Sequence, residues 1–347
     1  MKIAVDAMGG DYAPAAIVAG AGLAARQLAD HGGEIILVGI EDVVRAELDR
    51  QNLRLPNISI HHAPEVVAMN ESPRLALRQK VLSSVTVSVD LVRDGLADAA
   101  ISAGNSGAMM AAATMRLRCL PGVQRPAIAV AMPTPIGKRI VLDAGANVDC
   151  KPEHLADFAL MGSVYAEHAL KVERPRVGLL SIGTEDSKGN ELTLEAFRLC
   201  KLLDLNFVGN VEGHDLFRNH VDVVVCDGFV GNIVLKTCES LALAMFSMLK
   251  RELTANPRRQ LGALLARNAF RAIKRRMDPE GFGGAPLLGF NGTVMKAHGS
   301  ARERAIANAI KVTTENIQHH VNQTIAQEIA RANERLSAGE AVAAAAL

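Results

Sequence analysis

The chain has 347 residues, enough for two lobes or one large α/β domain with a sizeable core. Hydrophobic residues make up 49% and charged residues 22%, a globular composition that argues against a disordered or collagen-like chain. The net charge of +1, from 38 basic and 37 acidic residues, and an aromatic content of 3% both disfavour a nucleic-acid-binding protein.

Short β-branched runs alternate with longer helical patterns along the chain. The expected strands span residues 2–6, 34–39, 58–62, 98–102, 127–132, 139–143, 176–181 and 221–227. The expected helices span residues 14–30, 73–93, 106–118, 152–169, 191–203, 230–251, 258–277 and 300–335. Several strands, such as 221–225, are apolar on both faces, which is typical of a parallel sheet covered on both sides. The pattern therefore predicts a doubly wound three-layer α/β/α sandwich with a mostly parallel sheet.

No linker rich in proline or serine divides the chain, so we expect one large α/β domain over residues 1–335. A basic helical segment around 250–277 is expected to project from it, and the alanine-rich tail 336–347 to be disordered. Asp6 interrupts the N-terminus before a signal-peptide core could form. The longest uncharged stretch, 99–115, is too short and too polar to cross a bilayer. Five scattered cysteines are typical of reduced thiols, so we expect a cytoplasmic protein.

Clusters of glycine, asparagine and aspartate follow several of the expected strands. They are DAMGGD (6–11), SAGNSG (102–107), DAGAN (143–147), SIGTEDSKGN (181–190) and DGFVGN (227–232). In doubly wound sheets, ligands bind beyond the carboxyl ends of the strands. Glycine lets successive N–H groups approach one oxyanion, and a helix N-terminus adds partial positive charge. The clusters therefore predict an anion site, with a phosphate cradle at 104–107, although each cluster alone could simply form a turn.

Other site types are less well supported by the residues. The turn after the first strand lacks the GxGxxG fingerprint, and no Walker A or GxSxG motif is present, so NAD, ATP and a serine nucleophile are not expected. Cys226 ends an apolar strand and is interpreted as a buried structural thiol. His298 is interpreted as a capping residue or as one that faces an anion. Five carboxylates could ring a magnesium ion, but we favour their binding to loop N–H groups and therefore predict no metal. They are Asp6, Asp11, Asp143, Asp149 and Asp227.

The segment 250–277 is a basic island, with nine basic residues against Glu252 alone, a net charge of +8. Its apolar residues recur at helical spacing, and most of its cations lie elsewhere around the helix. Such a helix suits an anionic membrane surface or an acidic protein, although it could also pack on its own domain or on a second subunit. The candidate contact residues are Arg258, Arg259, Arg267, Arg271, Lys274 and Arg275. The glycine-rich apolar loop 281–289 is a candidate lining for an alkyl-chain pocket.

Taken together, DAMGGD, SAGNSGA, DAGAN, GTEDSKGNE, GNVEGHD, CDGFVGNIVLK, GGAPLLG and HGSA, in this order over residues 1–330, resemble the bacterial phosphate acyltransferases of phospholipid synthesis. Ser106 stands where that family usually has threonine, and the hydroxyl is kept. The resemblance implies transfer of a long fatty acyl group from acyl carrier protein to inorganic phosphate, without an organic cofactor. It implies a product used by a membrane glycerol-3-phosphate acyltransferase. It also implies a cytoplasmic or peripherally membrane-associated homodimer, with a fold related to phosphotransacetylases and isopropylmalate dehydrogenases.

For that reaction phosphate is itself the nucleophile, so the site must orient a dianion against a thioester and stabilise an oxyanion. We predict Lys188 and Asn232 as catalytic residues. The predicted phosphate-binding residues are Gly104, Asn105, Ser106 and Gly107. The predicted pocket walls are Asp6, Met8, Gly9, Gly10, Asp227 and His298. The basic island would then receive the acidic carrier protein, the membrane, or both.

Three other functions stay open at this point. An enzyme of the phosphotransacetylase type would share the phosphate cradle and differ in using acyl-CoA. A metal- and NAD-dependent decarboxylating dehydrogenase would share the fold, but the missing dinucleotide fingerprint argues against it. A non-catalytic adaptor for a membrane or carrier protein would need only the basic helix, and would leave the five clustered turns unexplained.

Overall fold

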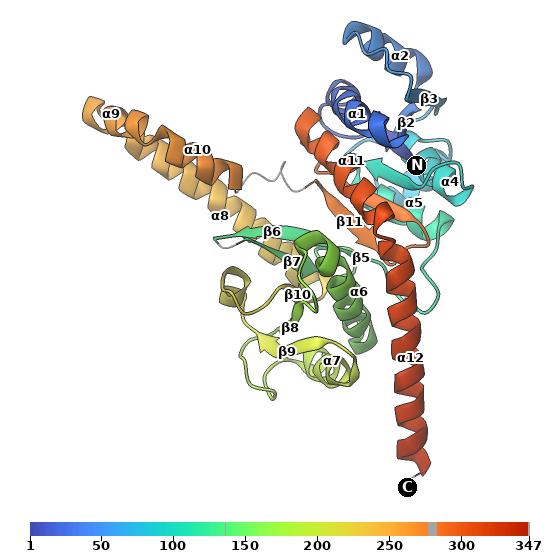
Figure 1. Cartoon of the computed structure of the whole chain (residues 1–347), viewed down its shortest axis with the longest axis vertical. Coiled ribbons are helices and arrows are strands. Elements are labelled where there is room, and N and C mark those ends of the chain that lie inside the picture. The colour runs from blue at the N-terminus through green and yellow to red at the C-terminus, as the bar shows by residue number, and fades with distance from the viewer. Residues whose placement is uncertain (136, 277–282, 346–347) are drawn as a thin grey trace.

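The computed structural model describes residues 1–135, 137–276 and 283–345, which form two lobes that each contain a β-sheet (Figure 1). The strands are β1 Lys2–Asp6, β2 Glu34–Gly39, β3 Ile58–His62, β4 Ala99–Ser102, β5 Ala127–Ile128, β6 Val130–Thr134, β7 Gly137–Leu142, β8 Arg176–Leu180, β9 Asn206–Val211, β10 Val223–Val225, β11 Ala285–Leu288 and β12 Thr293–Lys296. The first sheet has the order β3-β2-β1-β4-β12-β11-β5, and the second has the order β6-β7-β10-β8-β9. The α/β/α layering predicted from the sequence is confirmed, with its strands divided between two sheets.

The first sheet is parallel from β3 to β12, and β11 runs antiparallel to both of its neighbours. Alternate residues of each strand point to opposite faces, so both faces are apolar. Ile3 and Val5 of β1 face a helical layer formed by α1 Ala15–Leu28, α2 Glu41–Arg50 and α11 Glu303–Gln318. Ala4 and Ala100 face the other layer, formed by α4 Ser84–Arg93 and α5 Ser106–Arg116. The short helix α3 Pro73–Gln79 packs on α5 rather than on the sheet.

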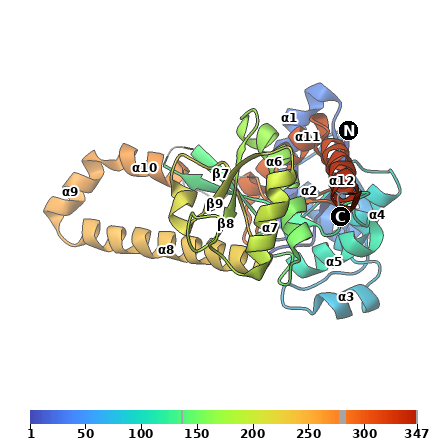
Figure 2. The same cartoon turned by 90° about the horizontal axis from the view of Figure 1, so that it is seen from below.

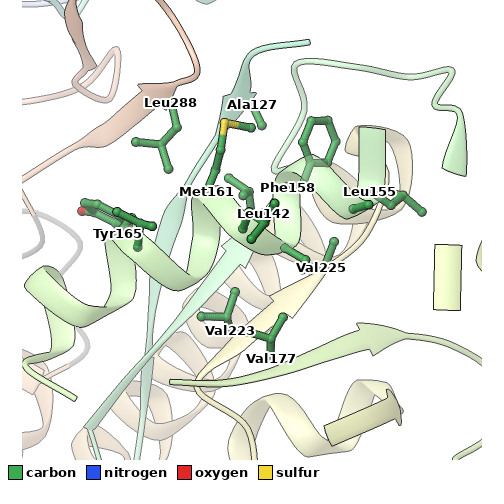
Figure 3. Close-up of a cluster of buried hydrophobic side chains, with 14 of the residues drawn as sticks. Ala127, Leu142, Leu155, Phe158, Met161, Tyr165, Val177, Val223, Val225 and Leu288 are labelled. Atoms are coloured by element: carbon green, nitrogen blue, oxygen red, sulfur yellow. The ribbon is translucent and has the colours of Figure 1, made fainter. Parts of the chain in front are cut away.

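The second sheet is parallel except for its edge strand β6. One face is covered by α6 Pro152–Leu170, α7 Glu191–Leu202 and α12 Val321–Ala345. Figure 3 shows buried side chains of this cluster, with Met161 of α6 reaching toward Ala127 of β5 and with Val223 and Val225 on the strand below the helix. The other face is smaller and packs against the first part of α8 Gly228–Thr254. This core fixes the carboxyl ends of β7, β10 and β8 side by side.

Helix α8 and the two helices that follow it form an arm that projects from the second lobe (Figures 1 and 2). The basic island is the part of this arm from residue 250 onward. Of the 27 residues of α8, only Gly228 and Gly231 are buried, and α9 Pro257–Leu265 and α10 Arg267–Arg276 run back along it. Many of its apolar side chains are exposed, including Leu241, Leu243, Met245, Met248 and Leu265. Among the described helices, α8 alone is long and apolar enough to cross a bilayer by length and composition. Lys236 and Glu239 interrupt its apolar run, so the longest uncharged stretch of the sequence lies elsewhere.

The structure also contains elements that the sequence pattern did not predict: α2, β9, β11 and β12. Strand β11 occupies residues 285–288 of the glycine-rich segment 281–289 that was interpreted as a pocket loop, and residues 281–282 of that segment lie outside the described residues. Each of the helices expected over 73–93, 258–277 and 300–335 is two helices. The backbone of α12 stays helical to Ala345, beyond residue 336, where disorder was expected; its side chains after residue 335 lie outside the described residues.

A buried carboxyl in the second lobe makes stability depend on pH. Asp157 of α6 is 8% exposed and accepts one hydrogen bond, from the backbone N–H of Gln124 (3.2 Å). Burial raises the pKa of Asp157 from 3.8 to about 6. The folded state therefore binds a proton on the Asp157 carboxyl more tightly than the unfolded state does. The protonated carboxyl stabilises the fold fully below pH 3.8, and this stabilisation is lost as the pH rises through 6. At pH 8 the cost is at most about 3 kcal/mol, or (6 − 3.8) × 1.36.

Asp157→Asn is therefore expected to raise the free energy of unfolding at pH 8 by up to about 3 kcal/mol. The asparagine Oδ1 can still accept the bond from Gln124. Urea unfolding of both proteins at pH 4.5 and pH 8 measures the effect, and the gain should shrink at the lower pH. An equal gain at both pH values would mean that Asp157 is ionised throughout.

Candidate active site

A cavity of about 590 Å³ lies between the two lobes. Its walls in the first lobe are α3, the face of α5 that runs from Ser106 to Met115, and Ile128 of β5. In the second lobe its wall is the loop that follows β7, through Gly145 and Ala146. Two of the predicted phosphate-binding residues, Ser106 and Gly107, line it. The cavity therefore joins two of the predicted clusters, one from each sheet, at the carboxyl ends of their strands, where such sheets bind ligands.

The cradle itself is the start of α5. Asn105 is the N-cap, and its Oδ1 accepts a hydrogen bond from the N–H of Ala108 (3.0 Å). Its Nδ2 donates to three carbonyls of the preceding loop, those of Ala68 (3.3 Å), Met69 (3.1 Å) and Glu71 (2.9 Å). Both ends of this side chain are thus engaged within the protein, which limits the role predicted for Asn105 to its backbone. The N–H groups of the first turn and the exposed Ser106 hydroxyl are the donors that face the cavity.

Asp6, predicted to form a pocket wall, lies behind the cradle. Its carboxylate is 2% exposed and accepts hydrogen bonds from Ser102 Oγ (2.6 Å) and from the Met8 N–H (3.2 Å). Ser102 Oγ in turn accepts a hydrogen bond from the Gly104 N–H (3.0 Å). Burial raises the pKa of Asp6, and the hydrogen bond from Ser102 opposes that shift. Asp6 therefore positions the loop that leads into the cradle and does not line the cavity.

Gly9 and Lys296 complete this supporting layer. A Cβ at Gly9 would lie 2.4 Å from the Oδ2 of Asp6 and 2.7 Å from the N of Gly104, so only glycine lets the two loops approach this closely. Lys296, at the end of β12, pairs with Ser102 of β4 in the sheet register and is 8% exposed. Burial lowers the pKa of Lys296 to about 8, and the negative charge of Asp6 opposes the shift. Lys296 was not among the predicted site residues, because the sequence pattern did not predict β12.

The second wall is held by another buried carboxylate. Asp143, fully buried after β7, accepts hydrogen bonds from the N–H groups of Gly145 (3.1 Å), Asn147 (2.7 Å) and Ile128 (3.0 Å). Burial raises its pKa, and these backbone donors oppose that shift. The loop it shapes lies against α8: a Cβ at Gly145 would be 3.4 Å from the Cβ and 3.6 Å from the Oδ1 of Asn232. Asn232, a predicted catalytic residue, therefore lies beside the lining residue Gly145 and is not itself among the residues that line the cavity.

The other predicted residues surround this centre without lining the cavity. Asp227 caps α8 by accepting a hydrogen bond from the N–H of Val230 (2.9 Å). Lys188 is exposed on the loop after β8, which neighbours β10 in the sheet. His298 is exposed on the loop after β12, and its Nδ1 is 2.8 Å from the Ser300 Oγ. Gly10 packs beside Gly299 of that loop, and Met8 packs on β2.

The described residues outside the cradle include no activated thiol and no cluster arranged for a metal ion. Cys226 is buried, and burial raises the pKa of its thiol well above the ordinary value, which fits a structural thiol and not a nucleophile. Among the described residues, no group of three or more His, Cys, Asp or Glu side chains is arranged to hold a metal ion.

A second cavity, of about 580 Å³, lies at the amino ends of the strands of the second sheet. Its guanidinium groups are engaged there, because Arg176 binds Asp222 (2.8 Å) and Arg139 binds Asn219 (3.0 Å).

The predicted carrier or membrane contacts lie on the arm. Arg258 and Arg259 are exposed on α9, where Arg259 pairs with Glu252 (2.6 Å). Arg267, Arg271 and Arg275 are exposed on α10, and the side chain of Lys274 lies outside the described residues. The arm points away from the lobes, so these cations are remote from the cavity (Figure 2). Arg74 and Arg78 of α3, which were not among the predicted site residues, do line the cavity. The available signal was their i, i+4 spacing with no acidic residue between them.

Residues 1–324 match the model of a family described as fatty acid synthesis protein. A phosphate acyltransferase of Trichlorobacter lovleyi is 52% identical over 329 residues, covering 95% of this chain and 94% of that protein. A phosphate acyltransferase of Geobacter sulfurreducens is 50% identical over the same length, with the same coverage. A phosphotransacetylase structure from Streptococcus pyogenes matches with a TM-score of 0.63 and 18% identity, covering 95% of this chain and 94% of that one. A branched-chain phosphotransacylase from Enterococcus faecalis matches at 0.54 and 14%, covering 92% and 100%. The structural likenesses show a shared fold.

Proposed function

The chain belongs to the fatty acid synthesis protein family of phosphate acyltransferases, and we propose that its acyl donor is a long-chain acyl carrier protein whose thioester is attacked directly by inorganic phosphate. It is an acyltransferase that transfers acyl groups to phosphate in lipid synthesis. The observation that carries the proposal is the cavity between the lobes. One wall presents the N-terminus of α5 with Ser106 and Gly107, and the opposite wall presents Gly145 beside Asn232.

Phosphate binding follows from the first wall. An anion at the start of α5 meets N–H groups that have no partner within the helix, the helix dipole and the Ser106 hydroxyl. The backbone of Gly104 stands behind it, held by Ser102 and Asp6. Lys188, on a loop at the same rim of the second sheet, supplies a positive charge that offsets the dianion. Asp227 follows β10 at this rim, and His298 follows β12 at the carboxyl end of the first sheet.

The transfer itself needs orientation and one oxyanion donor. A phosphate oxygen attacks the thioester carbonyl carbon, the C–S bond breaks, and the proton of hydrogenphosphate ends on the departing thiol. Holding the two reactants in line contributes up to about 7–11 kcal/mol. The amide of Asn232 donates to the tetrahedral oxyanion, an interaction that contributes about 2.7–4 kcal/mol. Because phosphate is the nucleophile, no enzyme thiolate is required, in keeping with the buried state of Cys226.

The arm supports two further parts of the proposal, a homodimer and a peripheral position at the membrane. Because α8 buries only two of its 27 residues and exposes many apolar side chains, we infer that it packs against a second copy of the chain in a homodimer. The cations of α9 and α10 then face an acidic carrier protein or an anionic membrane. A peripheral position of this kind, on an otherwise cytoplasmic enzyme, would bring the acyl phosphate to a membrane glycerol-3-phosphate acyltransferase.

Charge reversal on the arm tests this arrangement. Arg267→Glu with Arg271→Glu should release the protein from vesicles that contain anionic lipid, or raise the KM for the acyl carrier, because two attractive charges become repulsive. Co-sedimentation with vesicles and initial rates measure the two effects, and sedimentation velocity reports whether the dimer persists. If binding and KM are both unaltered, α10 does not contact either partner.

The donor is tested by trapping the product. The pure protein is mixed with inorganic phosphate and either palmitoyl-acyl carrier protein or palmitoyl-CoA, and acyl phosphate is converted to hydroxamate with hydroxylamine. We expect phosphate-dependent hydroxamate from the carrier substrate. Product from palmitoyl-CoA alone would assign the chain to the acyl-CoA-dependent type that the phosphotransacetylase-like fold also accommodates. No product from either, with folded protein, would contradict the acyl transfer itself.

A further inference from the structure

Two arginines stand on one wall of the cavity without a role in the function proposed above. Arg74 and Arg78 are four residues apart on α3, so they share a face of that helix. Both side chains are exposed, and both line the cavity that also contains Ser106 and Gly107. Figure 2 shows α3 outside α5, on the side of the molecule away from the tip of the arm. The pair therefore lies at an opening of the active site.

The carboxylates nearest to the pair in sequence have other partners. Glu71 binds Lys80 (2.7 Å), and Glu65 accepts a hydrogen bond from the N–H of Leu82 (2.9 Å). Within the described part of the chain, neither Arg74 nor Arg78 makes an ion pair. Like charges at i, i+4 destabilise a helix by a few tenths of a kcal/mol. The fold therefore maintains two uncompensated cations at the cavity, and that arrangement suits an anionic ligand.

The cavity also indicates how that anion is connected to the reacting group. Pro73, at the start of α3, packs against Gly107 of the cradle, and the lining continues along the two helices with the apolar Leu77 and Met110. A ligand that fills the cavity thus meets cations on α3, apolar side chains along both helices and hydrogen-bond donors at Ser106. The prosthetic group of an acyl carrier has three matching parts: a phosphodiester, a neutral pantetheine chain and a thioester.

We propose that Arg74 and Arg78 bind the phosphodiester that joins the pantetheine arm to the acyl carrier protein. The inference rests on the proposed function and adds the place where the donor enters. Guanidinium groups form charge-assisted, paired hydrogen bonds to phosphate oxygens. The inorganic phosphate that acts as nucleophile has a different cationic partner in the proposed function, the ammonium group of Lys188. The two anions of the reaction are thereby assigned to two different groups of donors in one cavity, the face of α3 and the start of α5.

The test compares two thioesters that differ only in the phosphate. Palmitoyl-4′-phosphopantetheine and palmitoyl-pantetheine are assayed with the wild-type protein and with Arg74→Ala/Arg78→Ala. We expect the wild-type protein to prefer the phosphorylated thioester in kcat/KM by about tenfold or more, and the variant to lose most of that preference. The KM for palmitoyl-acyl carrier protein should rise by a similar factor. A binding titration with fluorescently labelled 4′-phosphopantetheine and pantetheine measures the same preference without turnover.

The matched control is Arg331→Ala/Arg335→Ala on α12. These arginines have the same spacing, but they pair with Glu328 and Asp204 (2.5 and 3.2 Å) and do not line the cavity. An unaltered preference in the α3 variant overturns the inference. So does a rise in KM confined to the whole carrier, which would assign the pair to carboxylates of that protein, or a rise in the KM for inorganic phosphate. If the wild-type protein turns over no thioester, the proposed function fails, while the titration still decides the inference.

Discussion

Asn232→Ala is expected to lower kcat by about 10²–10³-fold, the typical effect of removing one donor to a tetrahedral oxyanion. The side chain is exposed, lies against Gly145 at the cavity wall, and makes no hydrogen bond to another described residue. Its amide is thus available to substrate. Alanine has a higher helix propensity than asparagine, so the free energy of unfolding should not fall. Steady-state rates with saturating phosphate and acyl carrier protein, alongside thermal unfolding, measure both quantities.

The control for Asn232 is on the same helix. Lys236 lies one turn further along α8 and pairs with Glu239 (2.8 Å), so Lys236→Ala changes the same helix face without altering the cavity wall. Its kcat should stay within about twofold of the wild-type value. If Asn232→Ala and Lys236→Ala both keep a kcat close to the wild-type value, Asn232 is not the oxyanion donor.

Lys188→Ala is expected to lower kcat/KM for phosphate by about 10²-fold, through loss of the positive charge that offsets the dianion. The loop does not depend on this side chain. Its shape is held by backbone groups, since the Lys188 N–H donates to the Glu185 carbonyl (3.0 Å) and the Lys188 carbonyl accepts from Ser181 Oγ (3.2 Å). The loss should therefore appear in kinetics against phosphate concentration and not in unfolding.

Two further variants separate charge from position. Lys188→Arg keeps the charge and should recover part of the loss, whereas Lys201→Ala removes a nearby lysine already paired with Asp186 (2.6 Å) and should have little effect. A kcat/KM for phosphate in Lys188→Ala within twofold of the wild-type value would exclude Lys188 from phosphate binding.

Local sequence was sufficient for the strand-end loops. The bounds of β1, β2 and β3 match those expected, because each is a short apolar run bounded by turn residues. The glycine–asparagine cluster at 104–107 does begin a helix at the cavity, since its capping chemistry lies within a few residues. These features depend on neighbours in the chain, and the sequence displays such neighbours directly.

The remaining features depend on contacts between distant segments. Strand β12 has four residues and is inserted between β4 and β11, so nothing local predicts it or the burial of Lys296 beside Ser102. Asn105 was expected to donate to phosphate, but its amide is taken by the loop around residues 68–71, a segment that the sequence analysis did not connect with it. The division of the strands between two sheets likewise depends on long-range pairing.

The central claim is that phosphate attacks the carrier thioester in one step. The most direct test mixes the protein with an equal amount of palmitoyl-acyl carrier protein in the absence of phosphate and measures the free thiol of the carrier over time. The account predicts no thiol until phosphate is added, after which thiol and acyl phosphate appear together. Stoichiometric thiol released before phosphate, with palmitate bound to the protein, would show an acyl-enzyme and contradict direct transfer.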